Sequence, residues 1–259
     1  MGKRKSRKME VRRRALQGVT NILLFNWHFY LMAIMVVVML LVSTHFVSES
    51  LVPFVMLLLI LVVGPIAVSL IVSYWIYDHS DLYALPWLPD LEGQQVLSVN
   101  AGFDEISSIL EKKYPTSSVS ICDFYDQDRH TEVSVKRARR AYPLHPATIQ
   151  ISTDQLPFAD QTFDYIIAML SVHEIRDQKE RGVFFKELRR VLKPHGSVFV
   201  TEHLRDFNNF IAFTLGFLHF HSKSTWLRTF EIGMFQVVSC HKTTPFVTTF
   251  TIRKDGTAH

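Results

Sequence analysis

The sequence predicts an α/β domain with a mainly parallel sheet, preceded by an N-terminal pair of membrane-spanning helices. Three observations lead to this fold class. Two long stretches near the N-terminus contain no Asp, Glu, Lys or Arg. From Gly93 onward, strand-like and helix-like segments alternate, which is typical of βαβ units. The last two strand-like segments have no helix between them, so we expect an antiparallel pair at a sheet edge.

Positive charge is concentrated at the N-terminus. The 259 residues carry a formal net charge of +4, but residues 1–14 hold eight Lys or Arg and one Glu, a net +7. The rest of the chain is therefore mildly acidic, at −3. Nucleic-acid recognition needs a basic face on the folded domain, so a nucleic-acid partner is not predicted. Cys122 and Cys240 form no disulfide framework, which favours a reducing compartment.

Both uncharged stretches are long enough to cross a bilayer. They lie between Arg14 and Glu49 and between Glu49 and Asp78, and about 20 apolar residues span about 30 Å of hydrocarbon. The sequence therefore predicts two transmembrane helices, at about 22–44 and 51–76. A helical hairpin inside a soluble core is disfavoured because two such runs are adjacent. A cleaved signal peptide is disfavoured because a second span follows the first.

The positive-inside rule places the basic tail, residues 1–14, in the cytoplasm. Two spans within 15–77 return the chain to the same side of the membrane. The connector at 78–93 is then expected to lie along the cytoplasmic membrane surface, and the globular part at 94–259 to lie in the cytoplasm. The sequence thus predicts a multi-pass membrane protein whose N-terminus and globular domain are both cytoplasmic.

The globular part is predicted to contain seven strands and three clear helices. The strands are expected at 95–99, 118–122, 147–151, 163–170, 197–201, 235–239 and 246–252. The helices are expected at 105–113, 131–141 and 179–192. The last helix has the strongest signal, because its apolar residues recur at helical spacing. The helix at 131–141 is basic, which is typical of a solvated face or of a contact with anionic lipid.

Polar residues follow the first three predicted strands. They are Asn100, Ala101 and Gly102 after the first strand, Asp123 after the second, and Asp154 and Gln155 after the third. Ligands of open α/β sheets bind beyond the carboxyl ends of the strands, and an acid after the second strand accepts hydrogen bonds from ribose hydroxyls. Each acid taken alone is also explained as a turn or N-cap residue. Their joint placement favours a ligand site.

Two segments resemble class I S-adenosylmethionine-dependent methyltransferases. DQLPFADQTFD at 154–164 and FKELRRVLKPHG at 185–196 are similar to the pattern of the ubiquinone/menaquinone biosynthesis branch. The resemblance extends over about 94–252. It implies S-adenosylmethionine as cofactor and a Rossmann-like seven-stranded sheet whose last strand is antiparallel. It also implies that Asp123 binds the ribose, that Asp154, next to Gln155, binds the adenine amine, and that Ser171 lines the methionine side.

The loop after the first strand departs from that family. The family pattern is D-x-G-x-G-x-G, whereas this chain has SVNAGFD at 98–104. Ser98 replaces the acid, and of the glycines Gly102 is kept. If the loop is an adaptation, Phe103 points away from the cofactor and Asp104 starts the next helix. If it has decayed, the chain is a catalytically inactive membrane scaffold.

Residues after the fourth strand face the methyl acceptor in this fold. His173 is a candidate general base that Glu174 or Asp177 would orient. The alternative is that His173 packs at the sheet edge while Glu174 forms an ion pair or caps a helix. Glu202 and His203 after the fifth strand form a second candidate cluster. No HExxH-like spacing joins His173, Glu174 and His203, so no metal site is predicted.

Residues 207–221 contain five Phe and few charges. They are interpreted either as core packing or as an apolar lid that dips into the membrane and admits a lipid-like substrate. The sequence therefore predicts a membrane-anchored S-adenosylmethionine-dependent methyltransferase of a hydrophobic or lipid-like small molecule. The alternatives are the inactive scaffold and a nucleotide-binding oxidoreductase, which the absence of GxGxxG disfavours.

Overall fold

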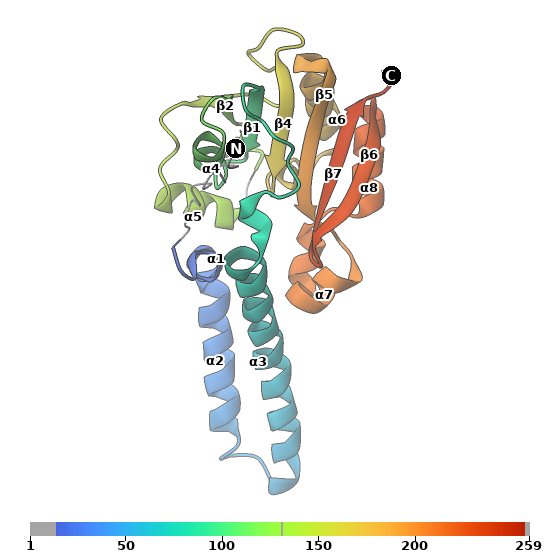
Figure 1. Ribbon diagram of the computed structural model, residues 1–259. Coiled ribbons are helices and arrows are strands. Elements are labelled where there is room, and N and C mark those ends of the chain that lie inside the picture. The colour runs from blue at the N-terminus through green and yellow to red at the C-terminus, as the bar shows by residue number, and fades with distance from the viewer. Residues whose placement is uncertain (1–13, 131, 257–259) are drawn as a thin grey trace, which may run out of the picture.

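The computed structural model describes residues 14–130 and 132–256, which form an α/β domain attached to a long helical hairpin (Figure 1). A seven-stranded sheet runs through the domain in the order β3-β2-β1-β4-β5-β7-β6. Its strands are β1 (Gln95–Asn100), β2 (Ser118–Asp123), β3 (Thr148–Gln150), β4 (Phe163–Met169), β5 (Leu192–His203), β6 (Phe235–Thr244) and β7 (Val247–Lys254). The strands from β3 to β5 are parallel, and β7 is antiparallel to β5 and β6. The predicted sheet with its antiparallel last strand is confirmed.

Burial accounts for the difference between central and edge strands. Every residue of β1 after Gln95 is buried, because helices or connecting segments cover both faces of a parallel sheet. Most residues of β6 are exposed, and this edge strand is 10 residues long, twice the length predicted. Its second half has no apolar pattern. The segment is extended because it pairs with β7 along its length.

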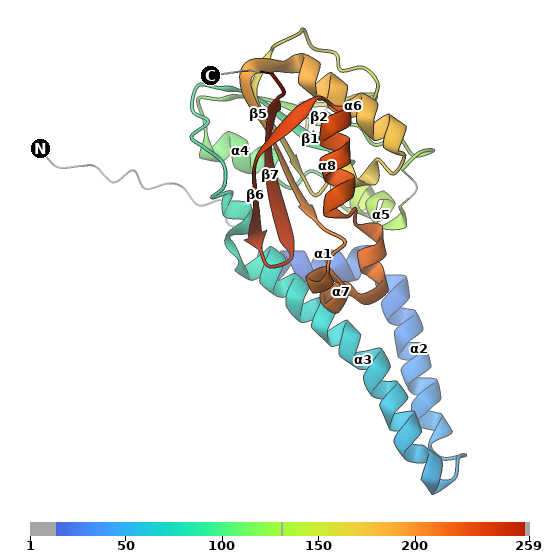
Figure 2. The ribbon, with the colours of Figure 1, turned by 90° about the vertical axis from the view of Figure 1, so that its right-hand side faces the viewer.

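Two helices cover one face of the sheet, α6 (Gln178–Val191) and α8 (Lys223–Ile232) (Figure 2). Their buried aromatic residues, including Phe184, Phe185 and Trp226, pack with strand residues in one core. The Asp177 side chain accepts the N–H of Glu180 at 2.8 Å and so caps α6. The periodicity predicted α6 to within one residue at each end.

The other face is covered by α4 (Ser107–Lys113) and by the chain that links the hairpin to the sheet. Leu82, Leu85 and Leu91 of this connector are almost completely buried. They pack with Val96 of β1 and with α4. The expectation that the connector lies along the membrane surface was wrong for these residues, because their leucines complete the second core of the sheet.

The hairpin consists of α1 (Gln17–Phe25), α2 (Trp27–Ser43) and α3 (Val52–Tyr74). α1 and α2 are bent by 75° at Asn26, whereas the sequence predicted one helix across this position. Asp78 explains where α1 lies, since its carboxylate accepts the N–H groups of Gly18 and Val19 at 2.7 and 3.0 Å. These are free donors of the first helical turn. The start of α1 is thus tied to the chain that follows α3.

α2 and α3 project together from the domain (Figures 1 and 2). Their exposed side chains are mainly apolar. Among the described residues, one continuous helical stretch, Glu49–Ala84, is long and apolar enough to cross a membrane. α1 and α2 meet this criterion only together, as a bent pair. Exposed side chains of α2 and α3 include Met32, Met35, Met39, Phe54, Leu57, Ile60, Leu61 and Ile71. The predicted basic tail, apart from Arg14, lies outside the described residues.

The carboxyl ends of the parallel strands face the hairpin. Tyr77, three residues after α3, has its hydroxyl 2.7 Å from Nε2 of His203 at the end of β5. α5 (Val133–Ala141) packs beside α1, where the guanidinium of Arg137 donates to the carbonyl oxygen of Phe25 at 2.6 Å. α7 (Phe207–Phe213) lies beside α3 (Figure 2). The edge of the sheet that carries ligands in such folds is therefore the edge nearest the hairpin.

Candidate functional site

The loop after β1 forms a tight turn at Gly102. Oδ1 of Asn100 accepts the N–H of Gly102 at 3.1 Å. Gly102 has a φ of 85°, a left-handed conformation that favours glycine. Asp104 accepts the N–H groups of Ile106 and Ser107 at 3.1 and 3.0 Å, so it caps α4. Asp104 thus lies just before α4, which begins at Ser107, two residues later than predicted.

The other side chains of this loop leave the turn open. Phe103 packs to one side, against Phe25 of α1 and Tyr142, with ring centroids 5.4 and 5.2 Å away. Ala101 is buried and small. Nδ2 of Asn100 is buried and has no hydrogen-bond partner among the described residues, which is unusual for an amide donor. At this turn, a ligand could therefore approach the backbone of Gly102 closely and accept a hydrogen bond from Nδ2 of Asn100.

Asp123, at the end of β2, is completely buried, and both of its carboxylate oxygens have partners. Oδ1 accepts the N–H of Tyr125 at 2.8 Å. Oδ2 forms an ion pair with the guanidinium of Arg139 from α5. A Cβ added at Gly102 would lie 2.8 Å from Cδ and from Nη1 of this same arginine. Arg139 thus fills the space between the β1 turn and the end of β2.

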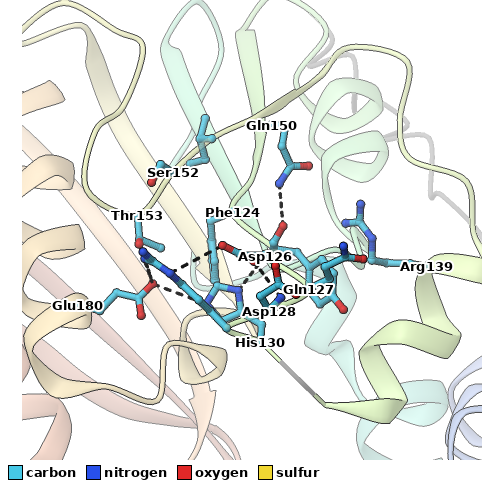
Figure 3. Close-up of a pocket in the computed structure, with 13 residues that line it drawn as sticks. Phe124, Asp126, Gln127, Asp128, His130, Arg139, Gln150, Ser152, Thr153 and Glu180 are labelled. Carbon is cyan, nitrogen blue, oxygen red and sulfur yellow. Dashed lines mark hydrogen bonds and ion pairs between the residues drawn. The ribbon is translucent and has the colours of Figure 1, made fainter.

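A cavity of ≈ 480 Å³ opens beside this ion pair, between the ends of β2 and β3 (Figure 3). Its size falls within the range of about 300–1,000 Å³ that is common for small-molecule sites. Aromatic surface comes from two residues that follow β2, and polar groups line the rest. The lining residues are Phe124, Tyr125, Asp126, Gln127, Asp128, Arg129, His130, Arg139, Gln150, Ile151, Ser152, Thr153 and Glu180.

Asp154 and Gln155 lie on the surface and do not line this cavity. The hydroxyl of Ser152 donates to the carboxylate of Asp154, and this hydrogen bond lowers the pKa of Asp154. Thr153 points into the cavity instead, and its hydroxyl donates to Oε1 of Glu180 at 2.7 Å. The cofactor roles of Asp154 and Gln155 stay predictions.

The end of β4 holds the acceptor-side candidates together. The hydroxyl of Ser171 donates to the carbonyl oxygen of Val99 at 3.0 Å, which ties β4 to β1. Oε1 of Glu202 accepts the N–H groups of Ser171 and His173 at 3.1 and 3.3 Å. Oε2 of Glu202 lies 2.7 Å from Nδ1 of His173. Glu202 therefore orients His173, a role for which the sequence analysis named Glu174 or Asp177; Asp177 instead caps α6.

Glu174 lies on the other side of the imidazole. Its Oε1 is 3.3 Å from Nε2 of His173 and 3.4 Å from Nε2 of His219. Burial lowers the pKa of His173, but the charge of Glu202 and hydrogen bonds to both carboxylates outweigh it and raise this pKa to about 10. Burial raises the pKa of Glu174, but its contacts with the two histidines outweigh burial and hold it well below its usual range.

His203 is a structural residue in this arrangement. Burial lowers its pKa to about 4, so its ring is neutral at pH 7. Nδ1 of a neutral ring then donates to the carbonyl oxygen of Phe246 at 3.0 Å, and Nε2 accepts from the hydroxyl of Tyr77. The histidine thus joins the end of β5 to the hairpin and the β7 turn.

Three site residues were missed in the sequence. Arg139 belongs to the basic helix, but its contact with Asp123 depends on where α5 packs. His219 ends the 3-10 helix Thr214–His219 and lies 46 positions after His173 along the chain. Glu180 lies in the first turn of α6. No local sequence motif predicts a site role for any of these three residues. For His219, the presence of histidines in the Phe-rich segment 207–221 is the one sequence feature that could have suggested such a role.

Comparison with known proteins identifies the fold. Residues 99–200 match the family model of a methyltransferase domain. The domain has the class I methyltransferase fold. A solved S-adenosylmethionine-dependent methyltransferase from Aquifex aeolicus has the same architecture, with a TM-score of 0.52, 17% identity, and coverage of 73% of this chain and 97% of that one. At 17% identity, this similarity shows a shared fold and does not show a shared substrate.

Two curated proteins match parts of this methyltransferase-fold domain. Ribosomal RNA small subunit methyltransferase C of Hahella chejuensis is 28% identical over 124 residues, which is 47% of this chain and 34% of that protein. YafE of Escherichia coli, whose function is uncharacterised, is 35% identical over 86 residues, 33% of this chain and 40% of that protein. The match thus spans well under half the length of either relative.

Proposed function

We propose that this chain is a membrane-anchored methyltransferase that uses S-adenosylmethionine and methylates a hydrophobic or lipid-like small molecule. The proposal rests mainly on Asp123, a buried carboxylate at the end of β2 next to both the Gly102 turn and the cavity. This is the ligand edge of an open α/β sheet. When bound, the cofactor would supply a methyl group activated by its sulfonium centre.

The residues at this edge suit the parts of that cofactor. Asp123 would accept hydrogen bonds from the ribose hydroxyls once Arg139 moves aside. The turn at Gly102 allows close approach of a ligand to the backbone, and the orphaned Nδ2 of Asn100 supplies a donor. Tyr125 provides an aromatic wall. Asp154 would reach the adenine amine only from the rim of the cavity.

The acceptor would bind near Ser171, His173 and Glu174. Burial, together with the charges of Glu174 and Asp123, raises the pKa of the Tyr125 hydroxyl despite the lowering effect of Arg139. The imidazole of His173 lies between two carboxylates, with Nδ1 2.7 Å from Glu202 and Nε2 3.3 Å from Glu174, so both acids orient the ring. The chain's contribution on this side would be to orient the acceptor.

A lipid-like acceptor fits the position of the site. The strand ends face the hairpin, so a molecule held in the cytoplasmic leaflet of the bilayer would lie next to the site. α7, which lies beside α3, and the 3-10 helix that follows it expose Phe207, Ile211 and Leu215. Exposed apolar side chains next to an apolar hairpin are expected where a protein enters the headgroup region. We therefore assign the hairpin to the membrane and α7 to its surface.

Topology can be tested with reporter fusions. Because α2 and α3 both join the domain at one end, two spans place both chain ends on one side, and the basic tail selects the cytoplasm. A fluorescent protein that matures in the cytoplasm should be bright when fused after residue 259, and alkaline phosphatase should be inactive there. Phosphatase fused after Ser48, in the hairpin loop, should be active. Phosphatase activity at the C-terminus contradicts the two-span arrangement.

Cofactor binding is the direct test of the proposed function. The full chain in detergent should bind S-adenosylmethionine in calorimetric titration, with a Kd between about 1 µM and 1 mM, the usual range of substrate affinities. With membranes and methyl-labelled cofactor, label should enter the organic-extractable fraction. If the folded protein binds no cofactor at millimolar concentration, the enzyme proposal fails and the inactive membrane scaffold replaces it.

A further inference from the structure

We propose that His173, Glu174 and His219 form a binding site for one divalent metal ion of the zinc class. Ligand atoms of these three residues all lie within 4.8 Å of one another. Oε1 of Glu174 is 3.3 Å from Nε2 of His173 and 3.4 Å from Nε2 of His219. Ligands about 2.0–2.1 Å from a tetrahedral ion are separated by about 3.3–3.4 Å. The two distances to Glu174 therefore already suit a shared ion.

A second shell of carboxylates supports both imidazoles. Metal-bound histidines usually donate their other ring N–H to a carboxylate, which fixes the ring and its tautomer. Nδ1 of His173 is 2.7 Å from Oε2 of Glu202, and Nδ1 of His219 is 3.3 Å from Oε1 of Glu132. Each histidine thus directs Nε2 toward Glu174 while a different acid holds Nδ1.

The remaining oxygen of Glu174 is an independent sign of a ligand. Glu174 is 5% exposed, and within the part of the chain that the structure describes its buried Oε2 has no hydrogen-bond partner. A buried carboxylate oxygen without a partner is costly. An ion between the two histidines that both carboxylate oxygens of Glu174 coordinate would give Oε2 the partner that it lacks. A plain ion-pair network among the same residues leaves Oε2 unexplained.

Hydrogen bonds from the Arg176 side chain to backbone carbonyl oxygens hold the two segments of the site together. His173 and Glu174 lie in the 3-10 helix Val172–Glu174, directly after β4, whereas His219 ends a distant 3-10 helix. The guanidinium of Arg176 donates to the carbonyl oxygens of both His173 and His219. Arg176 thus joins the segments without occupying a ligand atom.

Two histidines and one carboxylate leave a fourth position for an exchangeable ligand, as in catalytic zinc sites. The side chain of His219 is 28% exposed, so small molecules can approach from its side. If the proposed methyl transfer holds, the fourth position would take an oxygen of the acceptor and lower the pKa of that group. This last step rests on the proposed function, but the metal site does not.

The test is metal binding by the full chain in detergent, without a histidine tag and after removal of metal by a chelator. Zinc titration should show one ion per chain with a Kd below ~1 µM. Cobalt should give the intense visible absorption of a four-coordinate ion. Both measurements are made without S-adenosylmethionine, so failure here leaves cofactor binding as a separate question.

Variants locate the ion. His219→Ala should lower zinc affinity at least 100-fold, and Glu132→Gln, which spares all three ligands, should lower it about 10- to 100-fold. His145→Ala is the matched control, because Nε2 of His145 lies 3.4 Å from Glu111 and the described residues offer no third ligand there. The zinc affinity of this variant should equal that of wild type. Circular dichroism confirms folding. A folded wild type without a stoichiometric ion, or Glu132→Gln and His219→Ala that bind like wild type, overturns the proposal.

Discussion

Replacing Gly102 with alanine is expected to remove measurable binding of S-adenosylmethionine, with a loss of at least 100-fold in affinity. The φ of 85° costs an L-residue about 1–2 kcal/mol. The new Cβ would also lie where Arg139 now packs, 2.8 Å from its Cδ. Even with Arg139 displaced, this methyl group would narrow the turn that the cofactor must approach. Calorimetric titration and the melting temperature of the folded variant measure the two effects separately.

Gly93→Ala is the matched control. Gly93 has a φ of 73°, but a Cβ there would meet no atom within 4 Å. Both variants should lose similar stability from backbone strain, and only Gly102→Ala should lose cofactor binding. The opposite result, tighter binding in Gly102→Ala, would mean that the methyl group merely expels Arg139 and that the cofactor does not use the turn.

Local periodicity predicted most of the fold. The helix α6 and the strands β1, β2 and β4 follow patterns of apolar residues that depend on nearest neighbours in the chain. The length of β6 could not be predicted, because an exposed polar segment becomes a strand only through its partner β7. The burial of Leu85 and Leu91 was missed for a similar reason. They cover a sheet face whose position the connector sequence does not reveal.

The residues of the candidate site also fall into two groups, those that the local sequence predicts and those that only tertiary packing brings to the site. Asp123, Ser171 and His173 follow strands directly, so their shared edge can be predicted from strand order alone. Arg139 and His219 reach the site from helices whose packing depends on the hairpin and the Phe-rich segment. The metal-ligand geometry therefore has no spacing motif: two ligands are adjacent in the sequence, and the third arrives by tertiary folding.

Asp123→Ala should weaken S-adenosylmethionine binding by about 2–4 kcal/mol, roughly 30- to 1,000-fold, because two charge-assisted hydrogen bonds are lost. Asp160→Ala is the control, since Asp160 is an exposed acid in an ion pair with Arg190, distant from the cavity lining. Its affinity should not change. Titration of both folded variants decides the role of Asp123, and unchanged affinity in Asp123→Ala rejects it.

Variants of Arg139 provide a second test of the role of Asp123. The Arg139 guanidinium pairs with Oδ2 of Asp123, the carboxylate oxygen that the ribose hydroxyls would use. Arg139→Met should tighten binding about tenfold in the wild-type background and have no effect when Asp123 is already Ala. Arg137→Met, which changes a neighbour bonded to Phe25 on the same helix, should leave affinity unchanged. If Arg139→Met weakens binding instead, Arg139 belongs to the cofactor site as a ligand contact.

Thermal unfolding independently tests whether Arg139 and the cofactor ribose compete for the carboxylate of Asp123. In Arg139→Met, Asp123 stays fully buried with only the N–H of Tyr125 as a partner, and an unpaired buried charge is strongly destabilising. The variant without ligand should therefore melt below wild type. Ribose hydroxyls would restore the missing partners, so saturating S-adenosylmethionine should raise its melting temperature by more than it raises that of wild type. An equal rise in both proteins would mean that the cofactor does not replace Arg139 at Asp123.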